Sequence, residues 1–343
     1  MWRWTDGGVL APDSGVQSKR NRGTGAELGR FGRWAFESMA GARVRSPLER
    51  WFAPDRGMIE TMYGPAILAR TLSANRRKDK NGNVWQYHSR SDHHSKVACW
   101  GILFDLLREC PILREHVSSG AVVFGINHEM RDFKQNRKKD LDLVLARPRE
   151  TTAPSKKRGT FKSFVTRYGI VLTTEEQKAL DGLPDVNLGA VGAVQVALEA
   201  KACMTEHVKA LPRLYDELNS SHETIHASAD EAIAVGFVMI NIASEFVSPG
   251  RQASGKGAKQ ATQHDQPAVA ERAVQKIHEM PRRTKPGEHG FDAISIVVID
   301  CRNDGSPVRV SSAPPAPKAG DIYEYGLMIR RVAQLYASRF RVL

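Results

Sequence analysis

Three charged side chains stand in two of the most apolar segments of the chain. Asp142 directly precedes the apolar run 143–145, and Glu199 and Lys201 interrupt the apolar segment 194–202. Residues two apart on a strand share one face, so Glu199 and Lys201 are expected to point the same way. Charges in such surroundings are costly unless they are paired, bind a metal or face a cleft. We therefore take these three as the candidate catalytic residues.

These residue types suit phosphodiester hydrolysis. Asp142 and Glu199 offer the hard oxygen ligands that Mg²⁺ prefers, and a backbone carbonyl near Ala200 and water molecules would complete the shell. Asp140 lies on the same strand face and competes with Asp142 for the metal; we favour Asp142 because it directly precedes the apolar run. Lys201 would position the attacking water or help to deprotonate it, and would pair with the phosphate charge.

The pattern resembles that of the PD-(D/E)XK nuclease superfamily, in which an Asp at a strand start is followed by Glu-x-Lys on the adjacent strand. By this resemblance Asp142, Glu199 and Lys201 take the signature positions, within a region of about 92–247. The resemblance implies the α/β restriction-endonuclease-like fold, a mixed central sheet flanked by helices, and Mg²⁺-dependent DNA cleavage. Leu141 stands where the signature has Pro, and the long separation of Asp142 from Glu199 requires an inserted segment.

Glu-x-Lys alone carries little information, because a chain of this length is expected to contain about one copy by chance. A second copy, Glu176-Gln177-Lys178, lies in a polar segment with helical pattern, where it reads as a solvated helix face. For Glu199 and Lys201 the alternative is a structural salt bridge on a half-exposed strand. The apolar context and the strand that carries Asp142 favour the catalytic interpretation.

The charge balance indicates an acidic partner. Lys and Arg outnumber Asp and Glu by 50 to 38, which gives a net charge of +12. Between residues 131 and 167 there are twelve Lys or Arg against four Asp or Glu, so much of the excess surrounds the proposed site. Such a concentration would neutralise the phosphates of double-stranded DNA.

Several side chains near the signature residues are candidate DNA contacts. A polar cluster at a predicted helix N-terminus could bind a phosphate, with capping and surface polarity as the alternative. Basic residues before Asp142, and two residues on the helix after Lys201, are further candidates. The DNA-binding candidates are Arg90, His93, His94, Lys96, Arg137, Lys138, Lys139, His207 and Arg213.

Hydrophobic periodicity predicts the elements that position these residues. Asn81-Gly82 predicts a tight hairpin, and Thr173 with Glu176 predicts a capping box inside an insertion over 148–190. The segment 231–246 is a buried helix or a strand leading into one. The other predicted elements are helices over 92–109, 205–218, 269–280 and 323–340 and strands over 121–126, 141–145, 194–202 and 294–300.

The chain divides into a loosely ordered basic arm, residues 1–45, and one catalytic α/β domain, residues 46–343. Within the domain we expect a flexible loop over 249–267, followed by a C-terminal strand and helix. The four cysteines are widely spaced in apolar segments, which is typical of reduced thiols in a cytoplasmic protein. No apolar run is long enough to span a membrane, so no membrane association is expected.

The sequence therefore predicts a Mg²⁺-dependent endonuclease that cuts double-stranded DNA at a specific sequence, in the manner of a restriction enzyme. The N-terminal region, the Asn81-Gly82 hairpin and the insertion would serve as DNA-binding additions. Cutting both strands usually takes two active sites, so we expect a homodimer. Two alternatives remain open: a structure-selective repair or recombination nuclease of the same superfamily, and a non-enzymatic basic DNA-binding protein.

Overall fold

The computed structural model describes residues 61–74, 77–78, 84–149, 159–249 and 261–342. Within this part of the chain six strands form a central sheet in the order β10-β9-β6-β5-β4-β3. Neighbouring strands are antiparallel except for the β5–β6 and β6–β9 pairs, which are parallel. The strands are β3 (Val123–Asp132), β4 (Arg137–Pro148), β5 (Val191–Cys203), β6 (Ile233–Asn241), β9 (Ala293–Asp300) and β10 (Arg309–Val310).

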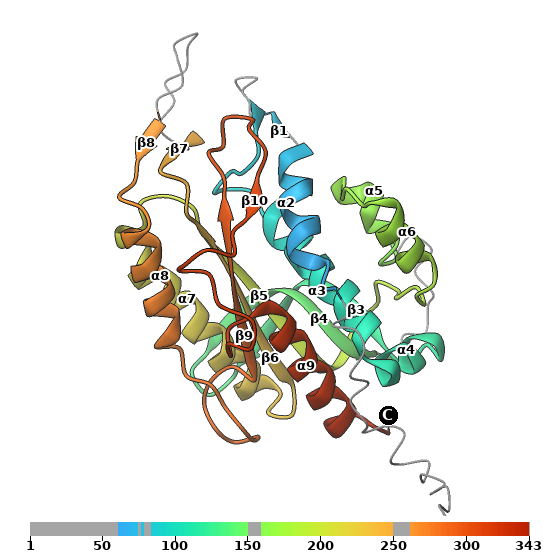
Figure 1. Cartoon of the computed structure of the whole chain (residues 1–343). Coiled ribbons are helices and arrows are strands. Elements are labelled where there is room, and N and C mark those ends of the chain that lie inside the picture. The colour runs from blue at the N-terminus through green and yellow to red at the C-terminus, as the bar shows by residue number, and fades with distance from the viewer. Residues whose placement is uncertain (1–60, 75–76, 79–83, 150–158, 250–260, 343) are drawn as a thin grey trace, which may run out of the picture. The chain divides into compact units, whose positions relative to one another are not determined.

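Helices cover both faces of this sheet (Figure 1). Helices α2 (Gly64–Ala74), α3 (His93–Glu109) and α9 (Tyr325–Arg339) pack on one face, and α7 (His207–Ser228) and α8 (Ala268–His278) pack on the other. A short helix, α4 (Pro111–Ser118), links α3 to β3. The predicted α/β class, a mixed central sheet flanked by helices, is confirmed.

Apart from α4 and the helices of the insertion, the region that carries the candidate residues follows the order α3, β3, β4, β5, α7, β6. The helix predicted over 92–109 is confirmed as α3, which is almost entirely buried between the sheet and the neighbouring helices. All nine residues of β6 are buried, because helices cover both sides of this inner strand. The apolar segment 231–246 therefore contains a nine-residue strand, β6, and no helix, as its β-branched residues favour.

Strands β3 and β4 are much longer than predicted. Their ladder runs from Val123 paired with Ala146 to Asp132 paired with Arg137, whereas β4 pairs with β5 only between Leu143 and Pro148. On the N-terminal side of Leu143, β4 and its partner β3 therefore continue as a two-stranded ribbon. Polar residues on both of its faces hid this ribbon from a search for apolar alternation.

The insertion forms a small helical layer beside α3. Its helices are α5 (Phe164–Tyr168) and α6 (Thr174–Asp181), and the predicted capping box of Thr173 and Glu176 is confirmed. The Trp100 ring of α3 stacks on Phe161 with ring centroids 4.8 Å apart. The solvated face predicted for the Glu-x-Lys copy in α6 is only partly right. Gln177 and Lys178 are exposed, but Glu176 is 2% exposed and pairs with Arg70 at 2.6 Å.

Two smaller ladders bear on other predictions. Strands β1 (Arg77–Lys78) and β2 (Val84–Trp85) pair as an antiparallel hairpin around Asn81-Gly82, whose turn lies outside the described residues. In the loop predicted over 249–267, strand β8 (Ala261–Gln263) pairs with β7 (Glu245–Val247), so regular structure extends into this segment. The predicted arm, residues 1–45, lies outside the described residues.

The four cysteines, Cys99, Cys110, Cys203 and Cys301, are buried and form no disulfide. Their burial agrees with a structural role for these side chains. Among the described residues, no helix combines the length and the apolar character needed to cross a membrane.

Candidate active site

A cleft of about 770 Å³ opens where the carboxyl end of β5 leads into α7. Its walls come from the loop 89–92, the start of α3, the middle of β4, the end of β5 and the first half of α7. The three signature residues, Asp142, Glu199 and Lys201, all line it. Asp142 lies one position beyond the last β4–β5 pair, Leu143 with Leu198, so the antiparallel register brings it beside Glu199.

Both oxygens of the Asp142 carboxylate accept hydrogen bonds. Oδ1 accepts from Lys96 Nζ at 2.8 Å and from the Ser95 hydroxyl at 2.9 Å, both on α3. Oδ2 accepts from the backbone N–H of Ala200 at 3.0 Å. Lys96 is also anchored by the side-chain oxygen of Asn127. These contacts fix the carboxylate at the junction of α3, β4 and β5.

Glu199 and Lys201 form a chain of charges that runs to α7. Lys201 Nζ lies 2.7 Å from Glu199 Oε1 and 3.1 Å from Glu217 Oε2, and Glu217 in turn pairs with Arg213 at 2.6 Å. The predicted shared face of Glu199 and Lys201 is confirmed by their contact. Glu199 Oε2 is the one buried carboxylate oxygen without a hydrogen-bond partner in the part of the chain that the structure describes.

Burial dominates the electrostatics of Glu199, whose side chain is 3% exposed. Burial raises the pKa of Glu199 to about 7, although the adjacent Lys201 opposes the shift. For Lys201, burial works to lower the pKa, but the carboxylates of Glu199 and Glu217 outweigh it and raise that pKa above its usual value. The ammonium therefore stays charged, which favours charge stabilisation over proton abstraction for Lys201.

The polar cluster at the start of α3 divides between the cleft and the interior. Arg90 and His94 line the cleft, and the His94 ring packs on Tyr87 with ring centroids 4.9 Å apart. Desolvation lowers the pKa of His94 to about 4, so its ring is neutral near pH 7. His93 points elsewhere: it is buried, and its Nε2 lies 2.8 Å from the carbonyl oxygen of Tyr168.

Three predicted DNA contacts are corrected by this geometry, because none of these side chains is free to reach a ligand in the cleft. His93 joins α3 to the insertion, and Lys96 is buried against Asp142. His207 is 2% exposed, and its Nε2 lies 2.8 Å from the carbonyl oxygen of Asn241. His207 therefore ties the start of α7 to the end of β6.

The remaining candidates lie in two places, and Lys139 among them is partly buried. Arg213 borders the cleft with its side chain 85% exposed, and Lys209, which the sequence analysis did not single out, borders it one turn earlier. Arg137 and Lys138 lie on the β3–β4 ribbon outside the cleft, paired with Glu223 and Glu129, and Lys139 reaches the carbonyl oxygen of Glu217. Asp140 is exposed on the rim of the cleft.

Sequence reasoning missed two partners of the signature residues. Ser95 was not among the candidate residues, yet its hydroxyl donates a hydrogen bond to Asp142. Glu217 gave no signal beyond its spacing of four from Arg213, and only the packing of α7 across β5 brings it to Lys201. The helix predicted over 205–218 begins at His207, with Glu206 at the N-cap position, and the Thr205 hydroxyl lies 3.0 Å from His264 Nε2.

The cleft offers oxygen donors for a hard cation. Glu199 Oε2 is buried without a partner beside Asp142, and carboxylate oxygens are the ligands that Mg²⁺ takes in proteins. No cluster of three or more His, Cys, Asp or Glu side chains suited to a metal occurs among the described residues. Mg²⁺ is commonly held by one or two carboxylates together with water and substrate phosphate, so two carboxylates fit it.

Comparison of the chain with protein-family models, with curated proteins and with solved structures found no match in any of the three. Any functional assignment therefore rests on the cleft itself.

Proposed function

We propose that this chain is a Mg²⁺-dependent endonuclease that hydrolyses phosphodiester bonds of double-stranded DNA at a specific sequence. The observation that carries the proposal is the unpartnered buried Oε2 of Glu199, held beside Asp142 and Lys201 in one cleft. A buried carboxylate oxygen without a partner is costly, so its presence at a cleft favours a ligand that supplies the missing contact.

Asp142, Glu199 and the backbone carbonyl of Ala200 would hold Mg²⁺, with Asp140 on the rim as a further oxygen donor. When bound, the cation supplies charge that stabilises the scissile phosphate in the transition state and lowers the pKa of an attacking water. Lys201, kept protonated by Glu199 and Glu217, donates hydrogen bonds to the phosphate oxygens on which charge develops.

The other side chains of the cleft position the reacting groups. Ser95 and Lys96 hold the Asp142 carboxylate in one orientation, so it need not reorganise when the substrate arrives. Arg90, Lys209 and Arg213 border the cleft and would neutralise the phosphates that flank the scissile bond. A homodimer would place two such clefts on the two strands of a palindromic site.

The test is to incubate mixed-sequence plasmid and phage DNA with the protein in Mg²⁺ or in EDTA. We expect discrete fragments in Mg²⁺ only, and loss of cleavage by at least about 100-fold in Glu199→Gln and Lys201→Met. The matched control is Lys178→Ala, which removes the Lys of the other Glu-x-Lys copy and should cut as the wild type does. A Mg²⁺-dependent smear would instead indicate a structure-selective or non-specific nuclease.

One observation favours the alternative of a non-enzymatic DNA-binding protein. Both carboxylates already have an ammonium partner, Asp142 in Lys96 and Glu199 in Lys201, as a structural role would require. That alternative predicts intact DNA in every lane, full DNA binding by Glu199→Gln, and loss of stability when either ion pair is broken.

A further inference from the structure

The β3–β4 ribbon ends in an exposed aromatic side chain. We define the hairpin arm as residues 128–141, the part of the two strands beyond the ladder with β5. Phe133 lies in the turn of this arm and is 79% exposed, whereas the phenylalanines of the core, such as Phe124 and Phe161, are fully buried. Burying a phenyl ring lowers the free energy of the folded chain, and exposing it forgoes that gain. Folding alone therefore does not explain the exposure of Phe133.

The turn holds Phe133 outward in a defined conformation. Asp132 is buried, and its Oδ1 accepts hydrogen bonds from the N–H groups of Lys134 at 2.9 Å and Gln135 at 3.1 Å. Asn136 closes the turn with a positive φ of 51°, a conformation that Asn tolerates. Because the backbone of the turn is bonded in this way, the ring needs no rearrangement to meet a partner.

One cation lies beside the ring, and others follow along the arm. The guanidinium of Arg131 lies 5.8 Å from its centroid, and Lys134, Arg137, Lys138 and Lys139 follow along the arm. Arg137 and Lys138 are paired with Glu223 and Glu129, but their side chains are 51% and 64% exposed. Exposed ion pairs of this kind contribute little to stability and can exchange a carboxylate for a phosphate.

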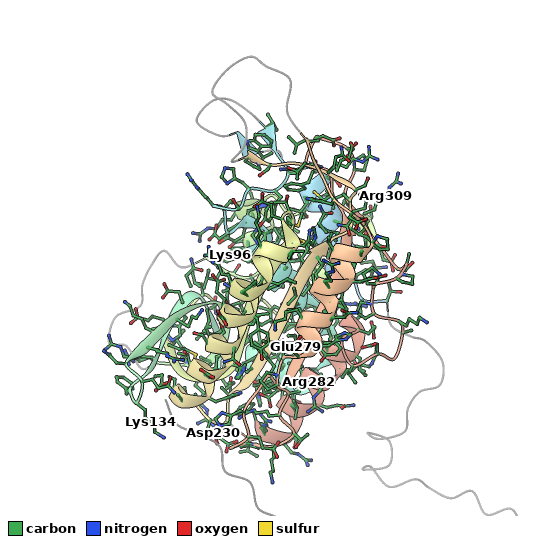
Figure 2. All side chains as sticks on the ribbon, turned by 90° about the vertical axis from the view of Figure 1, so that its left-hand side faces the viewer. Lys96, Lys134, Asp230, Glu279, Arg282 and Arg309 are labelled. Carbon is green, nitrogen blue, oxygen red and sulfur yellow. The ribbon has the colours of Figure 1, made fainter. Side chains whose placement is uncertain are left out.

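The arm continues from the proposed active site. Asp142 and Asp140 line the cleft, and β4 leads from them to the turn, which Figure 2 marks by Lys134. At about 3.3 Å per residue, the five residues from Asp142 back to Arg137 span about 17 Å, the length of about five base pairs. The same DNA could therefore occupy the cleft and meet the tip of the arm.

We propose that the hairpin arm is a DNA-binding element whose Phe133 ring inserts at a base step while its cations contact the flanking phosphates. The inference rests on the proposed function for the identity of the polymer. Apolar side chains enter opened base steps, and aromatic rings stack on unpaired bases. The preferred ligand is DNA with a step that opens readily, several base pairs from the scissile phosphate.

The opposite edge of the sheet provides a matched control. Strand β10 carries Val310, 43% exposed, beside the exposed Arg309, which is labelled in Figure 2. This pair also combines an apolar and a basic side chain on an edge strand, but it lies at the far end of the strand order from β3. Val310→Ala should therefore leave DNA binding unchanged.

The experiment measures binding of the full chain, in EDTA, to a fluorescent duplex with 2-aminopurine at a central step. We expect Phe133→Ala to bind about 10-fold more weakly and to lose the 2-aminopurine fluorescence increase, while Phe133→Trp retains both. Lys134→Ala should lower the salt dependence of binding by about one phosphate contact. Unfolding midpoints of the variants should match that of the wild type, because the ring is 79% exposed.

Equal affinity and fluorescence for Phe133→Ala and the wild type would overturn the proposal, as would absence of DNA binding by the wild type. Binding of anionic phospholipid vesicles that depends on Phe133, with no effect on DNA, would also overturn it in favour of a membrane surface. The cleavage assay is read separately. If DNA binding depends on Phe133 but no Mg²⁺-dependent cleavage occurs, the arm is a DNA-binding element and the chain is not a nuclease. If cleavage occurs but binding does not depend on Phe133, the nuclease proposal stands and the proposal for the arm is wrong.

Discussion

Carboxylates are buried beside cations at several places in the described residues, and two of these places differ in how the carboxylate oxygens are bonded. Figure 2 shows Lys96, the partner of Asp142, in the upper half of the molecule, and Asp230 near the lower end. At the latter end Asp292 is fully buried, and Oδ2 accepts from Arg283 at 3.0 Å and from the N–H of Ala234 at 2.8 Å. Its Oδ1 accepts from Arg339 at 2.6 Å. Every oxygen of this carboxylate is therefore occupied.

In the cleft, by contrast, Glu199 pairs one oxygen with Lys201 and leaves the other buried without a partner. A carboxylate that only joined strands would gain from a full set of donors, as Asp292 does. The difference indicates that charge at the Asp292 end serves the fold, whereas charge at the cleft end is kept available. The following changes test this contrast, beginning with the largest expected effect.

Replacing Asp292 by Ala should destabilise the protein by about 3 to 5 kcal/mol, because it leaves the buried guanidinium of Arg283 without its main partner. Urea unfolding measures the change. Asp300→Ala, at the exposed end of the same strand, is the control and should change stability by less than about 0.5 kcal/mol. A loss below about 1 kcal/mol in Asp292→Ala would contradict the structural role.

Glu199→Gln should change stability in a pH-dependent way, measured in EDTA. Folding raises the pKa of Glu199 from 4.5 to about 7, so stability that is present below pH 4.5 is lost as the pH rises to 7. Glutamine cannot ionise, so the free energy of unfolding of the variant should rise relative to that of the wild type by roughly 1 kcal/mol per pH unit between pH 4.5 and 7. A gap that does not vary with pH would mean that Glu199 is as well satisfied as Asp292.

His222, on α7, lies near Asp292 and should give a pH dependence of stability opposite to that of Glu199. It is 1% exposed and packs on Phe291, and burial lowers its pKa to about 4. Its contribution to stability is present above pH 6.5 and is lost as the pH falls to 4. His222→Gln should remove this loss, an effect of similar size and opposite sign to that of Glu199, seen in acid unfolding curves. Unchanged acid sensitivity would place the titrating group elsewhere.

The smallest effect on the fold is expected at the rim of the cleft. Arg213 is 85% exposed and pairs with the half-buried Glu217. Arg213→Ala should change the free energy of unfolding by less than about 0.5 kcal/mol, yet lower the salt dependence of DNA binding by about one contact. A large loss of stability with unchanged DNA binding would mean that Arg213 stabilises the fold and does not contact DNA.

The strongly periodic elements could be predicted from the sequence. The helix over 92–109 and the strands around Leu143, Val196 and Ile296 were found because their apolar residues repeat with the period of the element. The β3–β4 ribbon was missed beyond its apolar part, since exposed polar residues leave no such repeat. The capping box of Thr173 and Glu176 was found because a cap depends only on local spacing.

Residues of the cleft could be predicted only where a single sequence segment marks them out. Asp142, Glu199 and Lys201 stood out as charges in apolar runs, and strand register then brought them together. Lys96 was expected on DNA but lies on Asp142, because a helix packed across the sheet turns it inward. The Arg283–Asp292 pair joins a loop to a strand start, and no spacing in the sequence indicates such a contact.

The buried cysteines have a practical consequence for chemistry on this protein. All four thiols lie inside the fold, and burial raises the pKa of Cys203 and of Cys301 to about 12. Maleimides and disulfide reagents attack thiolates that solvent can reach, so the folded chain presents them with little to modify. A single cysteine introduced on the surface would therefore accept a fluorophore or a cross-linker selectively, without first removing the natural ones.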